Sequence, residues 1–260
     1  MIRNLQIEWM KIKNYRVFQV FSILYMLGIV IIIYMFYRIY TQLTSRLTGG
    51  DAADIFKLFS EDNIWTTVCF STSFLLYLPG MIIITLFINE VNYKTHRQNI
   101  IDGWKRETFI YTKIGLILCV AIAVTLMNII ATLLMCAIVG TEFSILSGLD
   151  MLGYTFILTF VYMMFALLLA TLFRRSGVAV IVFLVYGLLI EFLLMLLFWY
   201  LLPGTQHFLP LQVADSLITP DFQEGPFSKP PVKAVLITAA IAYASLYVYL
   251  TVRKYKYDDL

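Results

Sequence analysis

The stretch Glu90–Ile114 reads EVNYKTHRQNIIDGWKRETFIYTKI, a short charged segment between two long apolar runs. The flanking runs, 64–88 and 114–139, are each long enough to cross about 30 Å of hydrocarbon as a helix that rises about 1.5 Å per residue. Because both runs are continuously apolar and do not alternate with polar residues, a β-barrel is excluded. The stretch therefore predicts an all-α membrane protein in which a charged segment joins two spans.

Further runs of the same kind occur along the 260 residues, of which 61% are hydrophobic and 13% charged. No soluble domain of this size needs so apolar a composition. We expect a single polytopic transmembrane domain over residues 1–260. The six predicted spans are 17–37, 64–88, 114–139, 152–173, 178–202 and 234–252.

Lysine and arginine are unevenly distributed between the two sides that these spans define. Of the 19 basic residues, fourteen fall on the side of the termini and of Glu90–Ile114, and five fall on the other. Basic loops are retained in the cytoplasm during insertion. The bias predicts a multi-pass membrane protein with both termini cytoplasmic. A net charge of +3 is too small to indicate nucleic-acid binding.

Two regions outside the spans have patterns of their own. Residues 2–14 place apolar side chains on one face, which predicts a short interfacial elbow helix; these side chains are Ile2, Leu5, Trp9 and Ile12. The loop 203–233 on the opposite side is proline-rich and contains the apolar run Phe208–Ile218. We expect one or two short helices there, resting at the outer leaflet.

The opening stretch itself is typical of a short amphipathic helix over residues 95–108. Thr95 and Gln98 fit a capping box at its start. The apolar and basic side chains separate, with Ile100, Ile101 and Trp104 on one face and Arg97, Lys105 and Arg106 elsewhere. Such a helix either lies on the membrane surface or docks into a groove on a soluble partner, and periodicity leaves both interpretations open.

The order of features around this helix resembles the permeases of the ABC-2-type exporter family. The resemblance is carried by the Asn89-Glu90 junction, the run K-T-H-R-Q-N-I-I-D-G at 94–103, and Lys113 at the opening of the next span. It implies that the helix is a coupling helix that inserts into a cleft on a separate ATPase subunit. The residues implied in that contact are Arg97, Gln98, Ile100, Ile101, Trp104, Lys105 and Arg106. Glu90 would position the helix or pair with a basic neighbour.

The resemblance also implies the partners. The chain has no G-x-x-x-x-G-K-[ST] motif, so no cofactor is expected on it, and ATP and Mg²⁺ would bind to the partner ATPase. Six spans are half of the usual twelve, which implies a second copy related by a two-fold axis. Two other classes remain open. One is a non-transporting scaffold or immunity or sensor protein; the other, a membrane-embedded enzyme, lacks the clustered polar groups that catalysis needs.

Three features lie within the predicted spans. Glu191 and Asn128 stand near the middle of spans five and three, where a carboxylate costs about 2.5–3.5 kcal/mol on insertion scales. Either they line the translocation path, or they make buried hydrogen bonds between neighbouring helices. Pro79-Gly80 predicts a kink in span two.

Overall fold

The computed structural model describes residues 2–46, 60, 63–95, 101, 106–140, 148–220 and 230–257. Within these residues the chain is helical and contains no strand, and six of its helical segments are long and apolar enough to cross a membrane. The predicted all-α, six-span fold is therefore confirmed.

The spans follow one another along the chain, some as single helices and some as interrupted ones. The helix α1 (Ile2–Lys13) precedes them. The spans are α2 (Arg16–Arg46), α4–α5 (Ile64–Ser73 and Tyr77–Asn92), α7 (Arg106–Val139), α8 (Leu149–Phe173), α9–α10 (Ser176–Val185 and Glu191–Leu201) and α12 (Lys233–Tyr257). Between the last two lie the 3₁₀ turn Gln206–Phe208 and the short helix α11 (Gln212–Asp215).

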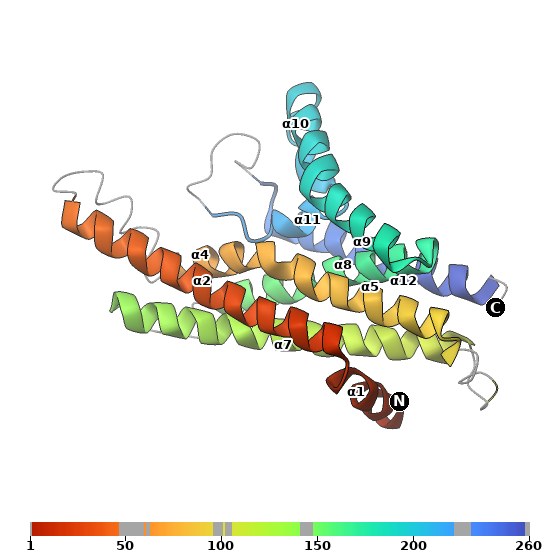
Figure 1. Ribbon diagram of the computed structural model, residues 1–260. Coiled ribbons are helices and arrows are strands. Elements are labelled where there is room, and N and C mark those ends of the chain that lie inside the picture. The colour runs from red at the N-terminus through yellow and green to blue at the C-terminus, as the bar shows by residue number, and fades with distance from the viewer. Residues whose placement is uncertain are drawn as a thin grey trace.

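The fourth span, α8, is the centre of the bundle. It is apolar on all sides, as suits the most buried of the six spans, and it packs against α5, α7 and α12. By contrast, α2 and α9–α10 expose most of their apolar side chains, which suits contact with lipid. Figure 1 shows α10 leaving the bundle at a steep angle, with α11 beside it.

The second span is interrupted where the sequence predicts a kink. Pro79 lacks an N–H and cannot bond to the carbonyl of Leu75, and the α-helix changes to a 3₁₀ turn over Phe74–Leu76. A Cβ added to Gly80 would clash with the ring of Phe183. Glycine at this position therefore lets α5 and α9 pack closely together.

Both chain termini lie at the same end of the bundle (Figure 1). We call this the basic end: it consists of α1, the last turn of α5, the first turns of α7, the Arg174-Arg175 turn and the last turn of α12. Here α7 begins at Arg106, eight residues before the predicted start of span three at Ile114. Residues 106–108, expected to end the coupling helix, thus belong to α7.

Candidate functional site

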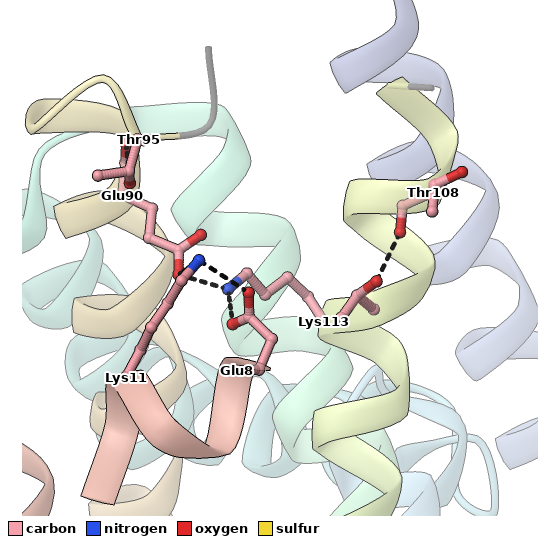
Figure 2. A network of polar contacts seen from close by, with 7 residues as sticks. Glu8, Lys11, Glu90, Thr95, Thr108 and Lys113 are labelled. Atoms are coloured by element: carbon pink, nitrogen blue, oxygen red, sulfur yellow. Dashed lines mark hydrogen bonds and ion pairs between the residues drawn. The ribbon is translucent and has the colours of Figure 1, made fainter. Parts of the chain in front are cut away.

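Lys113 lies two turns into α7 with its ammonium group between two carboxylates. Its Nζ donates to Glu90 Oε1 of α5 at 2.8 Å and to Glu8 Oε2 of α1. Figure 2 shows the three side chains converging from three separate helices. Lys113 is 3% exposed and Glu8 is 1% exposed. Charges buried this deeply are stable only when they are paired and hydrogen-bonded, as both are here.

Lys11 completes this group, which we call the basic-end network: Glu8, Lys11, Glu90 and Lys113. The Lys11 Nζ lies 3.4 Å from Glu8 Oε1 and 3.9 Å from Glu90 Oε1. Burial by itself raises the pKa of Glu8, but the charges and hydrogen bonds of Lys113 and Lys11 outweigh it and lower the pKa below its ordinary value. The Glu8 carboxylate is therefore ionised near neutral pH, and the network balances two cations with two anions.

The network explains how α1 is oriented. Glu8 and Ile12, one helical turn apart, both face the bundle, and Ile12 is 2% exposed. Trp9 is 55% exposed and packs edge to face on Phe18 of α2, with ring centroids 6.1 Å apart. Of the predicted apolar face of α1, Ile12 therefore packs against the protein and Trp9 is directed outward, whereas the side chains of Ile2 and Leu5 lie outside the described part of the chain. Its location at the membrane interface stays a prediction.

A second contact attaches α5 to the start of the chain. The side-chain amide of Asn89 donates to the hydroxyl of Tyr15, in the turn between α1 and α2. One turn of α5 therefore supplies adjacent residues, Asn89 and Glu90, that both bond to the N-terminal region. The segment 93–105 joins α5 to α7. The ion pair between Glu90 and Lys113 connects the two helices near the ends of this segment.

Most residues of the predicted coupling helix lie outside the described part of the chain: Arg97, Gln98, Ile100, Trp104 and Lys105. Arg106 begins α7, and its side chain is also outside that part. Ile101 is described and 77% exposed. The Thr95 hydroxyl donates to the Glu90 carbonyl at 3.2 Å, which closes the turn after α5. The expected contact between Thr95 and Gln98 involves a residue outside the described range.

Sequence reasoning identified Glu90 and noted Lys113, but it missed Glu8 and Lys11 as members of one site. A signal was present, because Glu8 is the sole acidic residue in the segment 2–14 and precedes Lys11 by three positions. An acidic residue beside the apolar face of an interfacial helix calls for a cationic partner.

Glu191 lies near the middle of the fifth span, at the start of α10 and directly after a π-helical turn, Tyr186–Ile190. It is 3% exposed, and its Oε1 accepts the backbone N–H groups of Leu211 at 2.6 Å and Gln212 at 2.8 Å. These are among the donors that the start of a helix leaves without intrahelical partners. Glu191 thus attaches α11 to the fifth span.

A cavity of about 410 Å³ adjoins this contact. Glu191 and Asp215 both line it, and the hydroxyl of Tyr162 on α8 donates to Asp215 Oδ2 at 2.7 Å. Burial raises the pKa of Asp215 to about 7, although the hydrogen bond from Tyr162 opposes the shift. Sequence reasoning missed Asp215 because it lies in the segment between spans, where an acidic residue is unremarkable.

Asn128 belongs to a different polar group. Its Oδ1 accepts the hydroxyl of Thr72 on α4, and its Nδ2 donates to the Val124 carbonyl at 3.0 Å. Asn128 therefore bonds α7 to α4, whereas Glu191 bonds α10 to α11. The structure does not bring the two predicted path residues into one site, and their role in a path stays a prediction.

The part of the chain that contains the basic-end network matches a known protein family. Residues 4–190 match the family model described as ABC-2 family transporter protein. This range includes all four residues of the network and ends just before Glu191. Among curated proteins, no sequence matches the chain.

Proposed function

Because this chain belongs to the ABC-2 transporter family, we propose that it is the permease subunit of an ABC exporter, driven by a separate ATPase subunit. Members of the family are membrane components of transporters and are not themselves enzymes. In the proposed complex two copies of the chain form the translocation path. ATP and Mg²⁺ bind to the partner ATPase, and both termini face the cytoplasm from the inner membrane.

The observation that supports this proposal best is the junction of Glu90 with Lys113. A partner that pushes on the segment 93–105 moves the spans only if the base of that segment is stiff. The ion pair at 2.8 Å between the buried Lys113 and the part-buried Glu90 joins α5 to α7 at this base, and the bond from Lys113 to Glu8 adds α1. A displacement of the segment would therefore be passed to three helices together.

The segment carries the residues that a docking helix needs. We assign Trp104 as the main anchor in a pocket of the ATPase, since a buried aromatic side chain typically dominates such an interface. Ile100 and Ile101 would flank it, and the 77% exposure of Ile101 supports an apolar face that is available at this place. The side chains proposed as rim contacts, which steer association, are Arg97, Gln98, Lys105 and Arg106.

The test is capture of the ATPase by the tagged chain from native membranes, with the captured subunit identified by its phosphate-binding motif. Trp104→Ala should weaken capture by about 30-fold or more, because loss of an anchor costs about 2 kcal/mol or more. Trp9→Ala is the matched control, since Trp9 is an exposed tryptophan of α1 at the basic end. It should leave capture unchanged.

The possible results separate the candidate functions. Equal capture by wild type and Trp104→Ala would mean that the segment lies on the membrane and that the ATPase, if any, docks elsewhere. Absence of an ATPase from the wild-type complex would favour the scaffold or sensor function. The mass of the captured complex tests the stoichiometry, for which we expect two permease chains with two ATPase subunits.

A further inference from the structure

A cavity of about 910 Å³ opens at the basic end between α7, α8 and α12. Its α12 wall carries three basic side chains: Arg253, Lys254 and Lys256. Glu107 of α7 is its one carboxylate among the described lining residues, and Lys256 pairs with that carboxylate at 2.7 Å. The described lining is therefore positively charged overall.

Of the basic residues that line this cavity, Arg253 is the one best placed to bind an anion. No carboxylate among the described residues pairs with it. Its guanidinium lies over the ring of Tyr249, 5.9 Å from the centroid, and Nη1 is 3.4 Å from the Tyr249 hydroxyl. The ring holds the guanidinium at the cavity while its remaining N–H groups stay free to bind an anion. The chain continues beyond Tyr257 with residues outside the described part.

A second, apolar cavity of about 540 Å³ runs from this one along the membrane-spanning part of the same helices. The two cavities share the lining residues Tyr111, Tyr249 and Val252, so they are adjacent along α12, and we call them together the groove. The apolar part exists because α12 presents small side chains at helical spacing, Ala240, Ala244 and Ser245, opposite the larger side chains of α8. The tyrosines at the junction are of the kind that membrane proteins place at headgroup level.

The groove thus has a basic part at the end of the bundle and an apolar part beside it among the spans. A phospholipid with an anionic headgroup has the same two parts. We propose that this groove binds an anionic phospholipid, with its phosphate at Arg253 and an acyl chain along Ala244 and Ser245. The assignment to the inner leaflet rests on the proposed orientation. The binding itself depends neither on that orientation nor on the ATPase.

The proposal is tested by native mass spectrometry of the purified, delipidated chain titrated with phosphatidylglycerol or with phosphatidylcholine of the same acyl chains. Phosphatidylglycerol should occupy the first site at lower concentration. Arg253→Gln/Lys254→Gln should weaken that binding by about 30-fold, since each basic contact near an anionic headgroup is worth a factor of about five. Ser245→Phe, which fills the apolar groove without changing charge, should weaken it as well.

The matched control is Lys13→Gln/Arg16→Gln, which removes two exposed basic residues of the same end that do not line the groove. Equal occupancy by the two lipids, or equal loss in the control, would overturn the proposal. So would an unchanged affinity in Arg253→Gln/Lys254→Gln. Thermal unfolding of each variant checks that it is folded.

Two further results would assign the groove to a different occupant. If inorganic phosphate displaces phosphatidylglycerol and Ser245→Phe has no effect, the pocket binds a free anion and not a lipid. If the variants alter the mass of the assembly or the capture of an ATPase while lipid occupancy stays the same, the groove is a protein interface. Either result contradicts the lipid site and leaves the proposed transport function intact.

Discussion

Replacing Lys113 by methionine should destabilise the protein more than any other single change in the basic-end network. Methionine keeps the length and the apolar part of the side chain. It removes the ammonium group that lies 2.8 Å from Glu90 Oε1 and that also bonds to Glu8. Among the described residues, Glu8, which is 1% exposed, would then keep Lys11 as its sole close cation. Removing one partner of a buried ion pair costs about 3–5 kcal/mol.

The expected cost translates into a measurable change in melting temperature. For a protein of this size 1 kcal/mol shifts Tm by about 2–4 °C, so Lys113→Met should lower the Tm by about 6–20 °C in thermal unfolding of the detergent-solubilised chain. The matched double variant Glu8→Leu/Lys113→Met removes both charges and should recover part of this loss. A Tm within about 2 °C of wild type for Lys113→Met would refute a stabilising role for the network.

The pH dependence gives the same experiment a second, independent outcome. In the wild type the pKa of Glu8 is lowered from its ordinary value of 4.5, so its stabilising contribution is complete above that value and is lost as the pH falls through the lowered pKa. Without Lys113, burial, which raises the pKa, is opposed by Lys11 alone. Lys113→Met should therefore lose less of its stability than wild type on acidification. The difference between the two proteins in free energy of unfolding should become smaller as the pH falls. A constant difference from neutral pH to below 4.5 would contradict the assignment.

Three further predictions concern other parts of the chain. In a background without native cysteines, a cysteine at Gln98 should be labelled by an impermeant reagent only from the cytoplasm, and one at Gln223 only from outside; the reverse pattern would invert the topology. Glu191→Gln should keep the Tm, because its amide oxygen can accept both backbone N–H groups. Glu191→Leu should lower the free energy of unfolding by about 1–3 kcal/mol for each N–H group left unpaired. Altered transport in the folded Glu191→Gln variant would indicate that the charge itself has a role in transport. Gly80→Leu should disturb the packing of α5 on Phe183, by about 1–3 kcal/mol as overpacking usually does, and an unchanged Tm would mean that the two helices separate at no cost.

The spans could be predicted from the sequence because hydropathy reports the hydrocarbon core directly. Their ends could not, since a helix continues past the apolar run wherever its backbone hydrogen bonds remain available. The third span shows this difference, because its apolar run starts at Ile114 but α7 starts at Arg106. The interruption in span two was predictable, because proline at position 79 acts on the backbone locally.

The site was predictable only in part, because its members are distant in sequence. Lys113 counts toward the basic bias as a residue at the end of a span, yet it is buried against Glu8, which lies 105 positions earlier. No local pattern encodes that pairing. Glu191 was recognisable as a rare acidic residue within a span, but its partners are backbone groups of α11, which carry no sequence signature. Fold class follows from composition, whereas these pairings follow from tertiary packing.

The distance between Glu8 and Lys113 along the chain also orders events during biosynthesis. At about 5–20 residues per second, the ribosome needs about 5–20 s to reach Lys113 after it has made Glu8. Throughout that interval two spans are inserted while the carboxylate of α1 has no Lys113 to meet. Until then, Lys11 is the cation of the basic-end network with which Glu8 can pair. Docking of α1 becomes complete only when the third span emerges, so the first element to be synthesised is among the later ones to reach its final place.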